Sequence, residues 1–437
     1  MGCGIQLDKE AFLSVSADHP NENAKVAQST FFYGWVVVAA STAVLAVQAG
    51  MIFSFGVFFK QLVAHFGWSR AATSGVFSMF MISHGAFAIA MGWFTDRFGP
   101  TKVMVFCGFM VGLGLVLSSL VNELWQLYVT YGLIVSMGVS GGFPVTTSTT
   151  ARWFTKQRGL ALGIVVGGTG LGTLIMLPIA DHLINVFGWS MAYFMLGVVA
   201  WVVMIPSACF LKRSSEDKRL RFSRMNKLIM SPDISDEEEA KDTTQGTGIA
   251  MKAALRCRPL WLLLSIYSLF NFSLHMVMVH LVNYATDLGI ASPLAATFVS
   301  TVGAASLLGR MTMGIASDRI GSSNALLICC TILAPTLVLL IFAKELWMFY
   351  LFAVTFGFAY GGEVPQIPAL IGRFFGLRAV AALIGVVMFG TSVGGALGSW
   401  VGGQIFDVTQ SYQGAFTIAL IASLSAVIIT VMLKKVQ

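Results

Sequence analysis

The chain has 437 residues, of which 56% are hydrophobic and 11% are charged, and its formal net charge is +7. Soluble proteins carry about 25% charged residues, so the composition excludes a soluble globular protein and indicates a polytopic membrane protein. The sequence contains no Walker lysine, metal-ligand spacing or catalytic triad. We therefore expect no enzyme activity, no cofactor and no metal.

Apolar segments of spanning length follow one another along almost the whole chain. They lie near 33–59, 71–93, 102–121, 124–151, 159–183, 188–211, 260–286, 294–316, 322–343, 346–372, 379–406 and 411–433. We therefore predict an all-α polytopic membrane protein with twelve transmembrane helices. The expected parts are a tail (1–30), a six-helix half (31–211), a linker (212–258), a second half (259–433) and a tail (434–437).

Lysine and arginine residues fall almost entirely on one side of this topology. If the amino terminus is cytoplasmic, the opposite side holds only Lys60, Arg70 and Lys344. This distribution follows the positive-inside rule and places both termini and the linker in the cytoplasm. The basic excess then reflects topology, and no nucleic-acid partner is needed to explain it. We expect the plasma membrane, or the inner membrane of a bacterium.

An internal repeat predicts how the twelve helices are organised. The stretch Gly92-Trp-Phe-Thr-Asp96-Arg97-Phe-Gly99 recurs 222 residues later as Gly314-Ile-Ala-Ser-Asp318-Arg319-Ile-Gly321. Six spans separate the two copies, and because six is even both halves have the same orientation. Two parallel six-helix halves place a substrate site between them, near the middle of the membrane.

Further motifs carry a resemblance to a known family. Tyr33-Gly34-Trp35 opens the first helix, and Trp153-Phe154-Thr-Lys156-Gln-Arg158-Gly-Leu-Ala161-Leu-Gly163 enters the fifth. Together with the repeated motif, these residues resemble the major facilitator superfamily, in its monocarboxylate transporter and oxalate/formate antiporter branch. The resemblance implies a secondary transporter of small carboxylates that works by alternating access.

The resemblance also implies site residues. In that branch an arginine on the eighth helix binds the substrate carboxylate, and Arg310 occupies the matching position. Tyr131 is the nearest match to a fourth-helix tyrosine, and Gln48 is a loose match to a first-helix glutamine. Phe53 and Ser306 replace a lysine and an aspartate of animal members. With one buried cation, a monoanion of the lactate or pyruvate type is the expected substrate rather than oxalate.

Arg310 is also singled out by physical chemistry. An arginine near the middle of a membrane helix costs about 2.5–3.5 kcal/mol on insertion scales, so it usually faces a polar cavity. It lies eight residues before Asp318, roughly 12 Å along a helix. Its guanidinium matches a carboxylate bidentately. The alternative is a structural arginine tied to backbone carbonyls or to Glu363. The repeat counterpart of Arg310 is Ala88, which favours a role beyond fold maintenance.

Proton coupling has three candidates. Glu363 lies at a depth similar to that of Arg310, and a substrate that competes for Arg310 would release it to take a proton; a permanent counter-ion is the alternative. His84 lies mid-span in the second helix, where a proton relay and a packing role both remain open. His280 and Asn283 have the spacing of one cavity face, with packing as their alternative. Tyr360 is a candidate lining residue.

The repeated motif and a glycine-rich stretch receive different interpretations. Asp96-Arg97 and Asp318-Arg319 are expected to bridge helices and their dipoles in one conformation and to separate in the other. The motif glycines, Gly92, Gly99, Gly314 and Gly321, provide tight turns or close helix contacts. Gly168-Thr-Gly170-Leu-Gly172 has no βαβ unit around it and is predicted to serve helix packing rather than nucleotide binding.

The function predicted from these residues is proton-coupled symport of a small monocarboxylate. An anion antiporter is the first alternative, and a carboxylate sensor that does not transport is the second. The partners are a small organic anion, a proton and the lipid bilayer. The sequence does not determine whether an ancillary subunit exists.

Overall fold

The computed structural model describes residues 20–68, 70–154, 157–213 and 249–435. These residues are almost entirely helical and include no β-strand. Residues 1–19, 214–248 and 436–437 lie outside the described residues and include most of the predicted linker and parts of both tails. The predicted domain boundaries there stay predictions.

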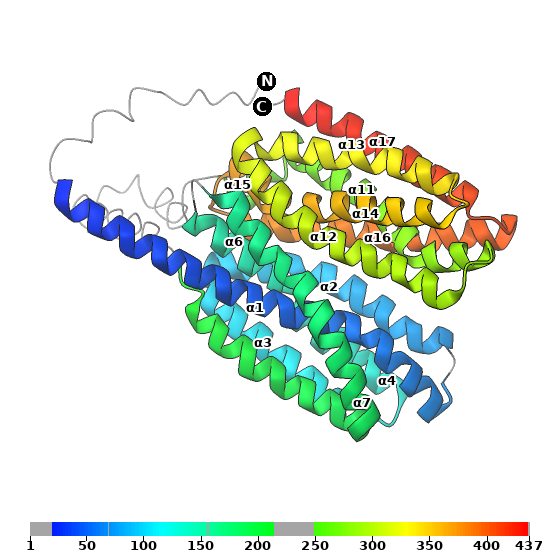
Figure 1. The fold of residues 1–437 in the computed structure, drawn as a ribbon. Helices are drawn as coiled ribbons and strands as arrows, with labels where there is room; N and C mark the ends of the chain where they lie inside the picture. Colours follow the sequence, from blue (N-terminus) through cyan, green and yellow to red (C-terminus); the bar gives the residue numbers. More distant parts are fainter. Residues whose placement is uncertain (1–19, 69, 155–156, 214–248, 436–437) are drawn as a thin grey trace.

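The helices before the linker form one half of the molecule, coloured blue to green in Figure 1. They are α1 (Pro20–Phe66), α2 (Arg70–Phe98), α3 (Pro100–Ser118), α4 (Leu124–Leu127), the π-helix η2 (Tyr128–Val135), α5 (Ser136–Ser140), α6 (Gly142–Trp153) and α7 (Arg158–Phe210).

The other half, coloured light green to red, begins after the linker. Its helices are α10 (Met251–Ala254), α11 (Arg258–Asp287), α12 (Ser292–Ile320), α13 (Ser322–Ile341), α14 (Leu346–Glu363), α15 (Gln366–Phe375), α16 (Val380–Thr409) and α17 (Gln413–Lys435).

The twelve predicted transmembrane helices are confirmed. Within the described residues, ten helices have the length and composition to cross a membrane. One of them, α7, has 53 residues and contains Gly188 at φ 81° and ψ 165°, outside the helical region, so it makes two spans. The remaining span is α14 followed by α15, which are separated at Val364-Pro365 because proline cannot continue the helical hydrogen bonds.

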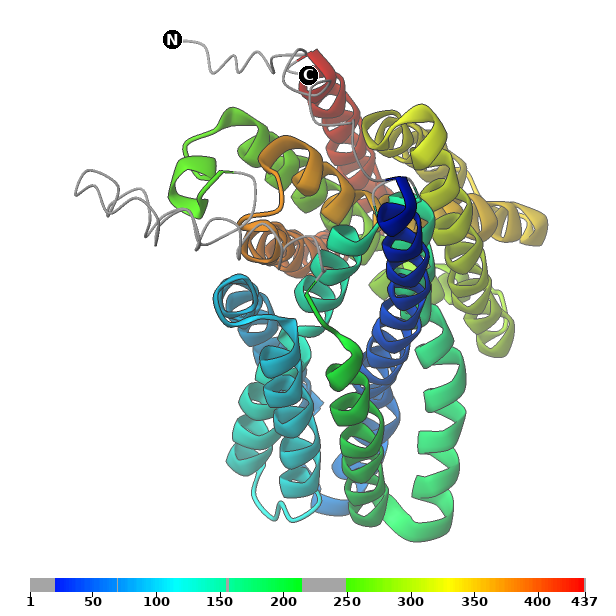
Figure 2. The same ribbon diagram turned by 90° about the vertical axis from the view of Figure 1, so that its left-hand side faces the viewer.

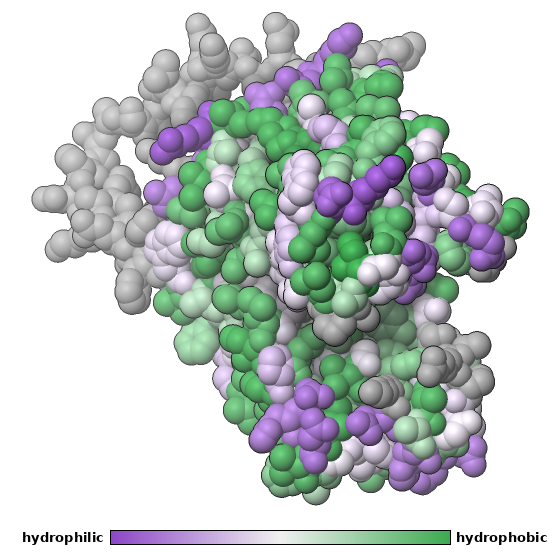
Figure 3. Space-filling model, turned by 45° about the vertical axis from the view of Figure 1, so that its right-hand side comes forward, coloured by the Kyte–Doolittle hydropathy of each residue, from purple (hydrophilic) through white to green (hydrophobic). Residues whose placement is uncertain are grey.

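Each half has its own hydrophobic core. One core of buried residues is built only from positions 40 to 211, and the other only from positions 254 to 433. Apolar side chains also cover much of the outer surface (Figure 3), as contact with hydrocarbon requires. The two views in Figures 1 and 2 show the halves as separate bundles that meet along α2 and α16, and along α7 and α12.

Candidate functional site

Arg310 lies on α12 where this helix packs against α7 of the other half. Its side chain is 5% exposed, and its guanidinium lies over the ring of Tyr360, 5.3 Å from the centroid. A Cβ added to Gly170 of α7 would be 3.1 Å from Nη1 of Arg310. The arginine therefore belongs to the carboxy-terminal half, while its donors reach the amino-terminal half. The structure brings Arg310 and Tyr360 together as candidate site residues.

The guanidinium of Arg310 has unused hydrogen-bonding capacity. Its Nε is buried and has no hydrogen-bond partner, and the described residues provide no ion pair to Arg310 within 4.0 Å. Leaving a buried charged donor unsatisfied costs at least about 1–3 kcal/mol. A purely structural arginine would be expected to make the bonds that this one lacks. The hydrogen-bond donors of this charged guanidinium are therefore available to a ligand between the halves.

Glu363 ends α14 close to this arginine. It is 1% exposed, and Nδ2 of Asn271 donates a hydrogen bond to its Oε1 at 3.4 Å. Arg310 interacts with it electrostatically, although no ion pair within 4.0 Å forms. Gln366 anchors the next turn by donating to the carbonyl oxygen of Met313 on α12, at 3.2 Å. Glu363 is thus held beside the arginine without being bound to it.

The equivalent place in the other half holds a neutral amide. The repeat counterpart of Glu363 is Gly142, and the Oε1 of Gln48 occupies the space where a Cβ on Gly142 would lie. Gln48 is 2% exposed and donates to the carbonyl oxygen of Gly138 at 3.4 Å. One half therefore has an amide facing glycine where the other has an amide facing a carboxyl group.

Tyr131 lies on the π-helix η2, inside the amino-terminal half. It is fully buried, and its hydroxyl donates to the carbonyl oxygen of Met51 at 3.0 Å. The ring packs against Phe55 and Phe80, with centroids 4.7 Å and 5.4 Å away. In this conformation the hydroxyl of Tyr131 is hydrogen-bonded to a residue of its own half. Its role in substrate binding stays a prediction, as does that of Gln48.

The histidine candidates occupy separate environments. His84 is half-buried and stacks on Phe80, with ring centroids 5.9 Å apart. His280 packs between α11 and α16, where its Nε2 lies 3.1 Å from the carbonyl oxygen of Ser399 and its buried Nδ1 has no partner. Asn283 is exposed near the end of α11. His280 is thus buried and Asn283 exposed, and the expectation that they share a cavity face stays a prediction.

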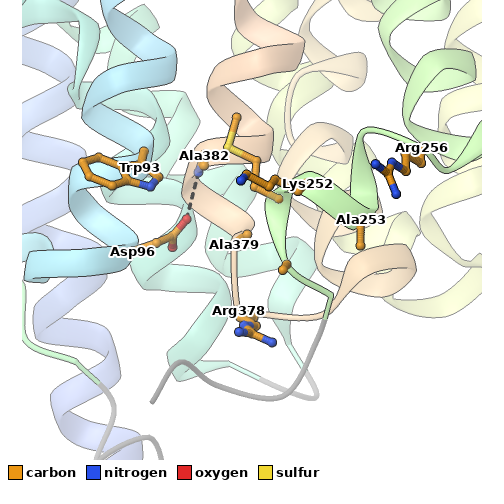
Figure 4. A pocket seen from close by; sticks show the side chains of 10 residues that line it. Trp93, Asp96, Lys252, Ala253, Arg256, Arg378, Ala379 and Ala382 are labelled. Atoms are coloured by element: carbon orange, nitrogen blue, oxygen red, sulfur yellow. Dashed lines mark hydrogen bonds between the residues drawn. The ribbon is translucent and has the colours of Figure 1, made fainter. Parts of the chain in front are cut away.

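The two motif aspartates join the halves at one end of the bundle, here called the motif end. Asp96 of α2 accepts hydrogen bonds from the backbone amides of Ala381 and Ala382 at the start of α16, at 3.4 Å and 2.9 Å. Figure 4 shows the bond to Ala382. Asp318 of α12 accepts bonds from the amides of Gly159 and Leu160 at the start of α7, at 2.7 Å and 2.9 Å. Each carboxylate caps the first turn of a helix in the opposite half, where the helix dipole favours negative charge.

The two caps differ in their surroundings. Asp96 is 6% exposed and also pairs with Arg152 at 2.7 Å. Asp318 is exposed, and Arg373, which lies 221 residues after Arg152 and corresponds to it in the repeat, makes no ion pair with Asp318 within 4.0 Å. Both Arg97 and Arg319 are exposed, and Arg97 lies over the ring of Trp93 at 5.3 Å. The repeated motif therefore forms two contacts between the halves that differ in burial and in ion pairing.

The motif glycines divide into two groups. Gly92 and Gly314 sit in helix interiors and allow backbone contact with Ala381 of α16 and Gly159 of α7, respectively. The others, Gly99 and Gly321, have φ of 97° and 86° and form the turns that follow α2 and α12, where a side chain would be strained. The contacts of Gly92 and Gly314 allow the backbones of the two halves to approach closely at the motif end.

Sequence reasoning missed several residues of this site. Gly170 was assigned to general packing, but it faces Arg310, while its neighbours Gly168 and Gly172 contact Thr42 and Ala46 of α1 in the same half. Asn271 was not selected as a partner of Glu363. The sequence has no local signal for either contact, because both depend on how the helices pack against one another.

Comparison with known proteins decides the family. A family model described as Major Facilitator Superfamily matches residues 38–283 and 261–436. The chain belongs to the major facilitator superfamily. It is therefore a multi-pass membrane transporter rather than an enzyme.

Curated relatives confirm the resemblance to monocarboxylate transporters. Monocarboxylate transporter 13 of Rattus norvegicus is 28% identical over 392 residues, which cover 89% of this chain and 86% of the relative. Monocarboxylate transporter 12 of Xenopus laevis is 27% identical over 402 residues, covering 89% and 85%.

Solved structures support the fold. The transporter FucP in its outward conformation aligns with a TM-score of 0.70 at 15% identity, covering 91% of this chain and 98% of FucP. The proton:xylose symporter XylE aligns with a TM-score of 0.68 at 14% identity, covering 91% and 95%. At these identities the likeness concerns the fold alone.

Proposed function

We propose that this major facilitator transporter moves a small monocarboxylate, of the lactate or pyruvate type, together with a proton. The observation that carries the proposal is the buried Arg310, whose Nε has no partner and whose guanidinium reaches between the halves. A bidentate guanidinium–carboxylate pair would satisfy these donors. The names of the relatives, which are monocarboxylate transporters, support the same substrate class.

In this proposal Glu363 takes the proton. A carboxylate substrate that pairs with Arg310 offsets the positive charge that opposes protonation of Glu363, so substrate binding assists proton uptake by this buried side chain. Moving one proton with one anion makes the loaded step electroneutral. It avoids a cost of about 2.3 kcal/mol per elementary charge per 100 mV of membrane potential.

The proposed topology places the motif end in the cytoplasm of the cell, with the protein in the plasma membrane or in a bacterial inner membrane. The support is the excess of lysine and arginine at that end of the sequence-derived topology. Because the capping contacts of Asp96 and Asp318 are formed at the motif end, this conformation would be closed toward the cytoplasm.

Uptake in proteoliposomes tests the proposal. Purified protein is reconstituted with an internal pH dye and offered labelled lactate, pyruvate, formate and oxalate. We expect uptake of a monoanion with internal acidification, abolished by Arg310→Ala and retained by Arg258→Ala, an exposed arginine at the start of α11. Uptake that requires a preloaded anion and leaves internal pH unchanged would instead establish the antiporter alternative. Wild-type uptake by Arg310→Ala would refute the assignment of the binding residue.

A further inference from the structure

A cavity lined by several charged residues lies at the motif end, apart from Arg310. Its volume is about 490 Å³, and it opens between α2, the segment around α10 and the start of α16 (Figure 4). Trp93 and Asp96 line it from the amino-terminal half, and Arg378 lines it from the loop before α16. Lys252 and Arg256 line it from α10 and the turn that follows. The cavity therefore spans the junction of the two halves.

The lining of this cavity is positively charged. Its single carboxylate, Asp96, is already engaged by Arg152 at 2.7 Å and by the amide of Ala382 at 2.9 Å. Lys252 and Arg256 are exposed, and no carboxylate of the described residues lies within 4.0 Å of them. With no counter-ion among the residues that the structure describes, these two cations beside an engaged aspartate favour an anionic ligand.

The cavity also borders a surface suited to lipid. Trp93, which lines it, is 41% exposed, and Phe94 and Phe98 on the same helix are 36% and 52% exposed. Exposed aromatic rings at a helix end are typical of the membrane–water interface. Basic pockets between transmembrane helices at this level bind phosphate headgroups of anionic lipids.

We propose that this cavity binds a phosphate-bearing anion, supplied as the headgroup of an anionic phospholipid. The phosphate contacts Lys252 and Arg256, and the acyl chains leave past the exposed aromatic rings of α2. Because its walls come from both halves, the occupied cavity stabilises the closed motif end, where Asp96 caps α16. The site thus couples lipid composition to the conformation of the transporter without touching the substrate site.

The test uses the full purified chain in neutral detergent. Phosphatidylglycerol or phosphatidylcholine is titrated in, and the unfolding temperature and the number of bound lipids, by native mass spectrometry, are measured. Lys252→Gln with Arg256→Gln removes the two cations. Lys434→Gln with Lys435→Gln, exposed at the carboxy-terminal end of α17 and outside the cavity, removes the same charge as a matched control.

We expect phosphatidylglycerol to raise the unfolding temperature more than phosphatidylcholine does, and to remain bound as a discrete adduct. The cavity variant loses most of this rise and the adduct, while the control variant keeps both. Equal losses in both variants, or no preference for phosphatidylglycerol in the wild type, overturn the site. If glycerol 3-phosphate gives the same saturable shift and the cavity variant abolishes it, the phosphate chemistry holds but the lipid source is refuted.

Discussion

Replacing Arg310 by methionine separates a ligand-binding arginine from a structural one. Nε of Arg310 is buried without a partner, so the wild type carries an uncompensated desolvation cost of about 1–3 kcal/mol. Methionine fills a similar volume and carries no charge. We expect Arg310→Met to lose transport and to unfold at a temperature equal to or a few degrees above that of the wild type, at roughly 2–4 °C per kcal/mol for a unit of this size.

The control for this experiment is Arg152→Met at the motif end. Arg152 pairs with the buried Asp96 at 2.7 Å, and removing one partner of such a pair typically costs about 3–5 kcal/mol. We therefore expect the two arginine-to-methionine variants to shift the unfolding temperature in opposite directions. Both are measured by thermal unfolding in detergent, and transport is measured in proteoliposomes.

The result that would refute the reasoning is a large loss of stability in Arg310→Met. Such a loss would mean that Arg310 holds the fold, through contacts to Glu363 or to backbone carbonyls. Because Glu363 loses its neighbouring positive charge in this variant, the double variant Arg310→Met with Glu363→Gln is measured as well. If Arg310→Met is unstable but the double variant is as stable as the wild type, the loss of stability comes from the unpaired carboxylate of Glu363, and Arg310 does not hold the fold.

Three further predictions follow from the same contacts. Gly170→Ala places a methyl group 3.1 Å from the Nη1 of Arg310, so we expect KM for the carboxylate to rise several-fold. The control Gly167→Ala places its methyl group 3.4 Å from a methyl carbon of Leu307 and is expected to leave KM nearly unchanged. Equal effects of the two variants on KM would contradict the contact between Gly170 and Arg310. Glu363→Gln is expected to abolish proton movement in the pH-dye assay while exchange of labelled anion persists, and intact acidification would exclude Glu363 as the proton carrier. Asp96→Asn is expected to lower the unfolding temperature more than Asp318→Asn, because Asp96 is buried and paired with an arginine, whereas Asp318 is exposed.

Much of the architecture followed from local features of the sequence. Long apolar segments, the linker composition and the repeat of Gly92–Gly99 at Gly314–Gly321 gave the number of helices and the two parallel halves. The distance from Arg310 to Asp318 predicted the depth of Arg310 in the membrane, because the rise per residue in a helix is constant. The cost of a charge in hydrocarbon then singled out Arg310 before any contact was known.

The contacts between distant segments were decided only by the tertiary structure. Asp96 meets Ala382, and Asp318 meets Gly159, across the two halves, and no local pattern in the sequence encodes these pairs. Helical periodicity likewise did not indicate that His280 is buried while Asn283 is exposed, because exposure depends on how the neighbouring helices pack.

The sequence by itself determined the number of membrane-spanning helices, the repeat and the place of Arg310 within an apolar helix, since hydrophobicity and charge act along the chain within each helix. Only the tertiary structure decided that Arg310 faces Gly170 across the junction, that Glu363 lies beside Asn271, and that the hydroxyl of Tyr131 is occupied by Met51. The physical reason is that these contacts depend on how whole helices rotate and pack, which is set by the sum of many side-chain volumes rather than by any one residue.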